Sequence, residues 1–270
     1  MNKLIIISTL LLVSCGSLKK QRTIDEEQFD GLKFESLKRF NSQRLGNIKE
    51  KNQKLVQCHQ GKTDVAFEDF KAELDKSLNN YLYWNQISTC YILKKEYTKA
   101  LNFLNLALAT SKTKEQKAMV LNNMGVVHLE QENFPEAKEY FKKSTELSPH
   151  FLTPQYNLTQ IYLKFGFYNK SRKLLTNLLN KNKNDIDFLH SYAYLELMTK
   201  NYKSALVFFN KIPEKYKYRD DIATNMAMTY YMLGLYENSL ESLNDAPKSN
   251  KYFLSKQMEI KKRIENMDRK

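Results

Sequence analysis

Apolar and small residues recur at helical spacing through most of the chain, and the pattern itself repeats. The clearest copy runs over residues 118–151 and predicts two short helices joined by a turn. On one face, the first of these helices would carry Leu121, Met124, Gly125 and His128. The second would carry Ala137, Phe141 and Ser144 on one face. Small residues at positions eight and twenty of the copy would let the two helices approach, with Phe141 filling the space beside them.

The same arrangement returns at a spacing of 34 residues, with copies beginning at Leu152, Ile186 and Asp220. A further copy begins upstream at Tyr81, and a longer loop, residues 110–116, is expected to separate it from the next. Position seventeen is aromatic in every copy: Tyr97, Phe134, Tyr168, Tyr202 and Tyr236. Departures are few, such as Thr159 at position eight of the third copy. Five copies in one register predict a repeat protein rather than a single globular core.

This pattern resembles the tetratricopeptide repeat, whose signature is a Leu-Gly-Tyr-like first helix, an Ala-Phe-Ala-like second helix and a closing Pro. The resemblance implies an all-α fold, an α-solenoid of about five helix-turn-helix repeats over residues 81–253. A helical segment would precede the repeats over residues 25–80, and a capping helix over 254–270 would follow them. The preceding segment could hold a degenerate repeat, with Gly61 at position fifteen and a second helix over residues 64–79.

The amino terminus has the features of an export signal. Lys3 precedes an apolar run, Leu4 to Val13, that is shorter than the ~20 residues needed to span a membrane. The run ends in Leu-Val-Ser before Cys15, which resembles a bacterial lipobox. The resemblance implies cleavage after residue 14, lipid on Cys15, a short tether over residues 15–24 and sorting to the outer membrane, facing the periplasm or the cell surface. The alternative is an ordinary secretory signal with a chance cysteine.

Two cysteines, Cys58 and Cys90, remain once Cys15 carries lipid. An even pair in an oxidising periplasm predicts a disulfide. If the degenerate repeat exists, both cysteines lie on neighbouring first helices. Two buried free thiols are the alternative.

Composition and charge favour a helical binding protein over an enzyme. The chain is 42% hydrophobic with seven Gly, and its formal charge is +13. Basic residues are spread along the sequence with no nucleic-acid motif, so we interpret them as a solvated coat and expect no nucleic-acid partner. The four histidines lack metal-ligand spacing, and no catalytic constellation or phosphate-binding loop is present. We therefore expect no metal, no cofactor and no catalytic activity.

A binding surface is expected where the first helices line the concave side of the solenoid. In the tetratricopeptide family, positions two, five, nine and twelve of the first helix face this groove, and position six can hold a ladder of amides. The candidate groove residues are Asn122, Asn123, Val126, Tyr156, Asn157, Gln160, His190, Tyr194, Asn225 and Met228. Apolar side chains interleaved with amides suit a peptide or a partner helix. The asparagines at position six could instead serve the repeat structure alone, and the carboxylate clamp of chaperone-binding members is not matched.

Lipobox and repeats together are similar to three kinds of outer-membrane lipoprotein: pilotins of type IV pilus secretins, a component of the β-barrel assembly machine, and adaptors of peptidoglycan hydrolases. The resemblance implies a scaffold, anchored by lipid, that binds a protein or peptide of the cell envelope and assists assembly or positioning of a complex. The alternatives are a structural protein docking on anionic lipid or cell wall, and a hydrolase adaptor.

Overall fold

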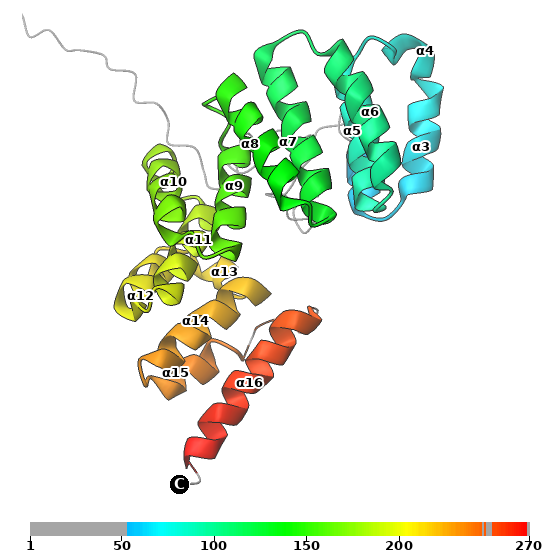
Figure 1. Cartoon of the computed structure of the whole chain (residues 1–270). Coiled ribbons are helices and arrows are strands. Elements are labelled where there is room, and N and C mark those ends of the chain that lie inside the picture. Colours follow the sequence, from blue (N-terminus) through cyan, green and yellow to red (C-terminus); the bar gives the residue numbers. More distant parts are fainter. Residues whose placement is uncertain (1–52, 245, 247–249, 269–270) are drawn as a thin grey trace, which may run out of the picture.

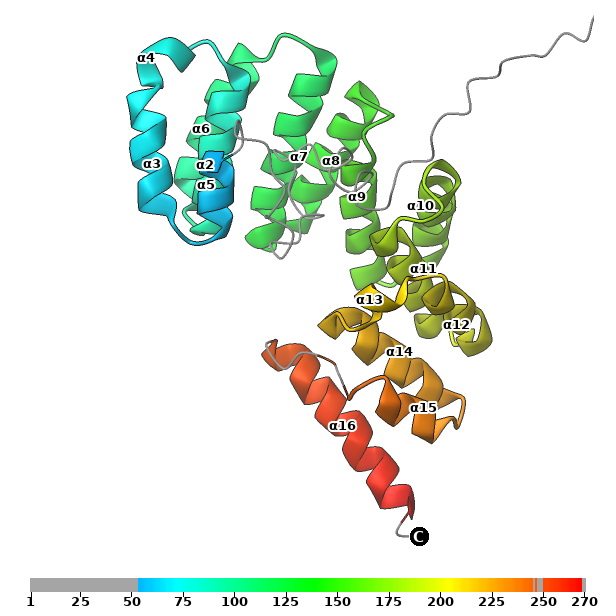
Figure 2. The ribbon, with the colours of Figure 1, turned by 180° about the vertical axis from the view of Figure 1, so that it is seen from behind.

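The computed structural model describes residues 53–244, 246 and 250–268. The expected signal peptide, the lipidated Cys15, its tether and residues 25–52 of the amino-terminal segment lie outside the described residues. Within them, helices stack in sequence order into a curved array (Figure 1). Seen from behind, α2 to α6 form one end of the array and α16 the other (Figure 2).

All regular secondary structure in the described residues is helical, which confirms the predicted all-α solenoid. The first helices of the five repeats are α5 (Tyr81–Leu93), α7 (Lys114–Glu130), α9 (Leu152–Lys164), α11 (Ile186–Met198) and α14 (Asp220–Met232). The second helices are α6 (Tyr97–Thr110), α8 (Phe134–Leu147), α10 (Tyr168–Lys181), α12 (Tyr202–Asn210) and α15 (Tyr236–Glu241). The remaining helices are α2 (Gln53–His59), α3 (Thr63–Ala72), α4 (Leu74–Ser77), α13 (Glu214–Lys217) and α16 (Lys251–Asp268).

The turn between the two helices of each repeat has one conformation throughout the array. Position fifteen is left-handed in all five repeats: Lys95, Glu132, Gly166, Lys200 and Gly234. The amide of the next residue donates to the carbonyl five residues earlier, as in Phe167 to Tyr162 at 2.8 Å, which ends the first helix in a Schellman motif. Each second helix then begins at the aromatic residue of position seventeen.

The hairpin of α2 and α3 uses the same turn. Gly61 has φ of +78°, and the amide of Lys62 donates to the carbonyl of Gln57 at 2.8 Å. Ala66 and Phe70, at the second-helix positions, are buried in the core that the hairpin shares with α5. The described part of the amino-terminal segment therefore has the helix-turn-helix geometry of the repeats.

Packing within each repeat follows the size of the side chains at positions eight, twenty and twenty-four. In the second repeat Gly125, Ala137 and Phe141 are buried where α7 crosses α8. In the fourth repeat Ala193, Ala205 and Phe209 repeat this arrangement between α11 and α12. The small residues allow the two helices of a repeat to approach closely, and one aromatic ring or leucine fills the remaining space between them.

Two boundaries differ from the sequence prediction. The loop expected over residues 110–116 is shorter, because α7 begins at Lys114. There Thr113 accepts from the amide of Gln116 at 3.2 Å, and the Gln116 side chain accepts from the amide of Thr113 in return, which completes a capping box. The second helix expected over residues 64–79 is broken at Glu73 into α3 and α4.

The carboxy-terminal helix α16 closes the last repeat, as expected of a solenoid cap. Ile260 and Ile264 pack on Ala227 of α14 and on Leu243. The helix begins at Lys251, and its first two turns extend beyond this contact. No helix among the described residues is both long and apolar enough to cross a membrane.

Candidate functional site

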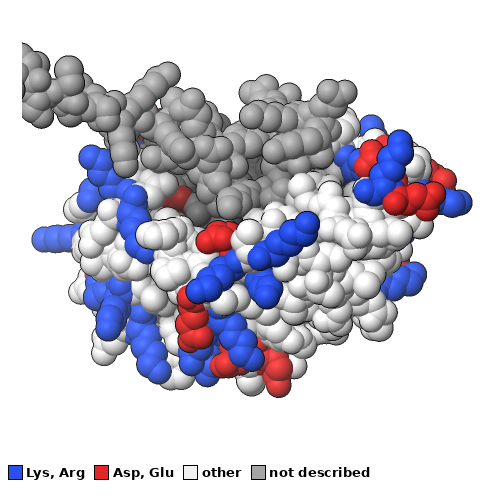
Figure 3. All heavy atoms as spheres, turned by 90° about the horizontal axis from the view of Figure 1, so that it is seen from above, with Lys and Arg blue, Asp and Glu red and all other residues white. Residues whose placement is uncertain are grey.

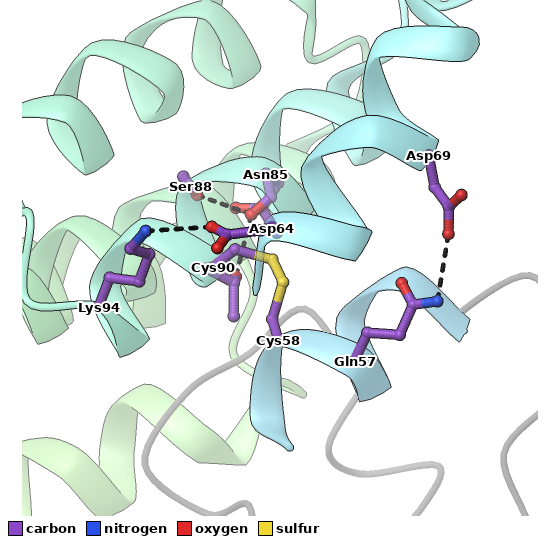
Figure 4. The surroundings of a disulfide bond; sticks show 9 residues. Gln57, Cys58, Asp64, Asp69, Asn85, Ser88, Cys90 and Lys94 are labelled. Atoms are coloured by element: carbon purple, nitrogen blue, oxygen red, sulfur yellow. Dashed lines mark hydrogen bonds and ion pairs between the residues drawn. A yellow bond between two sulfur atoms is a disulfide. The ribbon is translucent and has the colours of Figure 1, made fainter. Parts of the chain in front are cut away.

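The structure joins Cys58 and Cys90 by a disulfide (Figure 4). Their α-carbons lie 5.2 Å apart, because α2 packs directly against α5. Both residues are buried, and ion pairs or hydrogen bonds such as Gln57 to Asp69 (3.1 Å) and Lys94 to Asp64 (3.7 Å) lie around them. The bond therefore links the amino-terminal hairpin covalently to the first repeat.

Polar side chains on the concave faces of the first helices form a ladder that runs across the repeats. Asn157 of α9 donates to Asn122 of α7 at 2.9 Å, and Asn122 donates to its neighbour Asn123 at 3.1 Å. Asn123 donates in turn to Asn85 of α5 at 3.1 Å. These amides are fully or almost fully buried. The asparagines therefore hold neighbouring repeats in register, which was one of the two roles open from the sequence.

The ladder continues to the carboxy-terminal end with other residue types. Gln160 of α9 donates to Ser191 of α11 at 3.0 Å, and His190 of α11 contacts the Asn225 amide of α14 at 3.0 Å. Gln257 of α16 donates to Thr224 of α14 at 3.0 Å. Six of the ten predicted groove residues therefore belong to this ladder, and Val126 is buried beside it.

The remaining predicted groove residues, Tyr156, Tyr194 and Met228, keep part of their surface exposed. Tyr194, Asn225 and Met228 line a single cavity of about 350 Å³ at repeats four and five. Burial, followed by nearby Tyr252 and Tyr168, raises the pKa of Tyr194, so its hydroxyl stays protonated and can donate a hydrogen bond. The structure therefore gathers three of the predicted residues into one concave site.

The sequence did not predict the third wall of this cavity, which α16 forms beside α11 and α14. Tyr252, Phe253 and Lys256 lie on the first two turns of α16, which had been interpreted only as a cap. The available signal in the sequence was Tyr252 itself, which is 66% exposed in the structure, because a cap needs no large aromatic residue on its outer face. Methionines from two first helices, Met198 and Met232, complete an adaptable apolar rim.

Beside the cavity residue Asn225, a partly buried ion cluster joins α11 to α14. The guanidinium of Arg219 donates one hydrogen bond to Asp187 at 2.8 Å and two to Asp221, at 2.7 Å and 3.1 Å. His190 Nδ1 lies 3.4 Å from the same Asp221 carboxylate, and its Nε2 faces the Asn225 amide nitrogen. An amide donor at Nε2 requires a lone pair there, so the neutral ring carries its proton on Nδ1, toward Asp221.

Burial and charge set the titration of this cluster. Burial lowers the pKa of His190, which outweighs the opposing effect of Asp221. Burial would raise the pKa of Asp221, but its interactions with His190 and with the Arg219 guanidinium lower it to about 2. The pKa of Arg219 is raised, because Asp187 and Asp221 outweigh the cost of burying its charge. At neutral pH the ion pairs of Arg219 with Asp187 and Asp221 therefore link α11 to α14. His190 belongs to this cluster rather than to an open surface.

Basic side chains are spread over the outer surface of the array. In the view of Figure 3, Lys and Arg are scattered over the described face, with Asp and Glu among them. Many lysine ammonium groups lie over aromatic rings, as Lys164 does over Phe134 at 4.6 Å. Among the described residues, no three His, Cys, Asp or Glu side chains are placed to hold a metal ion.

Comparison with known proteins agrees with this architecture. Residues 78–149 match one family model of the tetratricopeptide repeat, and residues 128–195 match a second. The chain therefore contains tetratricopeptide repeats, a class whose stacked helices form extended concave surfaces for protein or peptide partners.

A curated relative, the uncharacterized protein ycf37 of Cyanophora paradoxa, is 32% identical over 80 residues, or 29% of this chain. The chain covers 46% of that relative, about half its length. Among solved structures, Pseudomonas aeruginosa PilF superposes with a TM-score of 0.62 at 15% identity, covering 87% of this chain and 99% of PilF. PilW, described as a widely conserved type IV pilus biogenesis factor, gives 0.59 at 19% identity, covering 71% and 88%. At these identities the likeness establishes the fold alone.

Proposed function

We propose that the protein is a non-catalytic scaffold that binds a segment of a partner protein in the concave cavity of repeats four and five. The cavity carries the proposal, because it is the place where predicted groove residues remain accessible and converge. Its walls combine Tyr194, Met228 and Phe253 with the Asn225 amide. Tyrosine and methionine give large contact area and an adaptable fit, and an amide can pair with a peptide unit.

The proposed place of action is the outer membrane, where lipid on Cys15 would anchor the chain with the solenoid facing the periplasm. This part rests on the lipobox-like sequence that precedes Cys15. The partner would be an envelope protein whose assembly or positioning the scaffold assists. The shared fold with PilW, a pilus biogenesis factor by its description, supports a pilotin-like role as the first form of this proposal to test.

Site-specific photocrosslinking tests the binding site. A photoreactive phenylalanine analogue replaces Tyr252 in cells of the native host, and crosslinked partners are identified by mass spectrometry. The matched control places the analogue at Val207 of α12, which is similarly exposed on another helix. A defined envelope protein captured from position 252 and absent from position 207 is the expected result. Equal capture at both positions would contradict the assignment of the cavity.

A double variant tests whether the groove carries the affinity. Tyr156→Ala with Tyr194→Ala removes two partly buried groove tyrosines, of which Tyr194 lines the cavity, and should reduce capture of that partner severalfold. Tyr218→Ala with Val207→Ala removes two exposed side chains that do not line the cavity and should leave capture unchanged. Circular dichroism must show both variants folded. Undiminished capture by the folded groove variant would overturn the proposal.

The anchoring is tested separately. Labelled palmitate should be incorporated into the wild-type chain and lost in Cys15→Ala, and the wild-type chain should fractionate with the outer membrane. An unlabelled wild-type chain would remove the lipid anchor from the proposal and leave the binding site standing.

A further inference from the structure

The turn between α9 and α10 carries two phenylalanines where three of the other four repeats carry polar residues and the fifth carries leucines. Phe165 and Phe167 flank Gly166, and their side chains are 49% and 52% exposed. Three repeats carry polar or charged residues at these two positions: Lys94 and Glu96, Gln131 and Asn133, Thr199 and Asn201. Those polar turns form the same Schellman motif. The turn conformation therefore does not require the two exposed rings, although Phe167 also contacts Tyr162 and Phe165 contacts Phe134.

The charge of this repeat is equally distinctive. Residues 164–183 contain six cations and no acidic residue: Lys164, Lys170, Arg172, Lys173, Lys181 and Lys183. The corresponding helix of the second repeat, α8, alternates Lys138, Lys142 and Lys143 with Glu136, Glu139 and Glu146. Helices α6 and α12 also lack acidic residues but carry one lysine each, so the four cations of α10 exceed what solubility alone requires.

Cations and rings form one surface at the turn. The ammonium group of Lys170 lies 5.2 Å from the ring centre of Phe167, and Lys164 lies over Phe134, which Phe165 contacts. Lys170 and Lys173 are exposed and form no ion pair among the described residues, whereas Arg172 is paired with Glu196. We define Lys164, Phe165, Phe167, Lys170 and Lys173 as the basic aromatic patch.

Acidic residues approach the patch from one side. Glu130 at the end of α7 and Glu132 in the turn between α7 and α8 line a small cavity together with Lys164. The positive charge without compensation is therefore on the α10 side, at Lys170 and Lys173. An anionic surface would therefore approach the patch over α10 and the tip of its turn.

We propose that the basic aromatic patch docks the solenoid on the surface of an anionic lipid bilayer. Exposed phenylalanines at a turn tip can enter the boundary between headgroups and acyl chains, and lysines beside them can bind headgroup phosphates while their stems lie along apolar surface. Each basic side chain near an anionic membrane contributes about a fivefold factor in binding. This surface is distinct from the concave cavity, so the patch would orient the solenoid on the membrane while the cavity stays free for a partner.

A depth-sensitive reporter tests the docking in the full chain. The chain has one tryptophan, Trp84, which is buried and gives a constant background. Phe167→Trp adds a reporter in the patch, and Val207→Trp adds a matched reporter at an exposed site on α12. Both proteins are mixed with vesicles of brominated phosphatidylcholine and phosphatidylglycerol. Because bromine quenches only indoles that reach the bilayer, the Phe167→Trp reporter should lose emission and the Val207→Trp reporter should not.

Charge variants separate docking from any other membrane attachment of the chain. Lys170→Gln with Lys173→Gln in the Phe167→Trp protein should weaken docking about thirtyfold and restore emission. Lys142→Gln with Lys143→Gln on α8 is the matched control and should change nothing. Vesicles of brominated phosphatidylcholine alone should not quench the patch reporter.

Three results would overturn the proposal. One is an unquenched Phe167→Trp reporter on anionic vesicles, and another is equal quenching of both reporters. The third is a response of the patch reporter to a single-stranded oligonucleotide without a response to vesicles, which would assign the patch to nucleic acid instead. Because the test does not involve the concave cavity or Cys15, its failure leaves the proposed scaffold function untouched.

Discussion

The ring of Phe141 lies against the α-carbon of Gly125, where α8 crosses α7. A β-carbon built on Gly125 would lie 2.6 Å from Cε1 and 2.8 Å from Cδ1 of that ring. Such distances require the ring to move, and Phe141 is completely buried. The contact thus fixes how closely the two helices of the second repeat approach.

Gly125→Ala should destabilise the protein despite the better helix propensity of alanine. Overpacking of a buried contact costs about 1–3 kcal/mol, against about 1 kcal/mol gained from replacing a helical glycine. We expect a net loss of about 1 kcal/mol in the free energy of unfolding, measured by urea denaturation.

The double variant Gly125→Ala with Phe141→Leu serves as the control. The third repeat already pairs a larger residue at position eight, Thr159, with Leu175. Relief of the clash should make the double variant more stable than the sum of the two single changes predicts. Strict additivity would show that the two residues do not oppose each other as the structure indicates.

Reduction of the Cys58–Cys90 disulfide should loosen the amino-terminal hairpin and spare the distant repeats. The bond closes a sequence separation of 32 residues, for which the loss of chain entropy in the unfolded state corresponds to about 3–4 kcal/mol. Hydrogen exchange should accelerate in α2 and α3 after reduction, while α11 and α14 stay protected, because repeats are coupled mainly to their neighbours.

The variant Cys58→Ala with Cys90→Ala is the matched control, and its exchange should not respond to reductant. Thiol labelling of the denatured, unreduced wild-type chain gives an independent answer. Labelling of both Cys58 and Cys90 under those conditions would contradict the bond.

Arg219→Met should be one of the most destabilising single substitutions in the described part of the chain. The change leaves Asp187 and Asp221 facing each other without the guanidinium between α11 and α14, which should cost about 3 kcal/mol. Arg263→Met is a suitable control, since Arg263 pairs with Glu259 on the solvent-exposed face of α16. Equal and small effects of both substitutions in urea denaturation would show that the buried cluster contributes little.

Acidification should destabilise the protein through its buried histidines. Burial lowers the pKa of His59 to about 4 and also lowers that of His190. The unfolded state, with ordinary histidine pKa values near 6.5, then binds protons more strongly than the folded state. Stability is therefore fully present above about pH 6.5 and is lost as the pH falls toward 4.

Urea denaturation at a series of pH values measures this loss. His59→Gln should flatten the dependence between pH 6.5 and 4, whereas His150→Gln, at an exposed position, should retain it. Below pH 4 a further loss is expected as Asp221, with its pKa near 2, takes up a proton. An unchanged pH profile for His59→Gln would refute the assignment to this residue.

Short-range rules accounted for the repeat itself. The register of five copies fixed where each second helix begins, because the aromatic residue of position seventeen follows the turn in every repeat. The capping box of Thr113 and Gln116, which the repeat pattern does not include, starts α7 at Lys114, ahead of the repeat boundary. In three turns the left-handed residue is Lys95, Glu132 or Lys200, and no feature of these side chains predicts that conformation.

The solenoid follows from the sequence alone, because small and large residues at fixed positions set the distance between paired helices. The sequence also predicted the disulfide, a prediction that rested on an even pair of cysteines in a chain with an export signal. The polar groups that meet across repeats, in contrast, are visible only in the folded structure. The ladder from Asn85 to Gln257, the Arg219 cluster and the third wall of the cavity all join residues on different helices. Such contacts depend on the angle at which one repeat stacks on the next, and no local sequence signal specifies that angle.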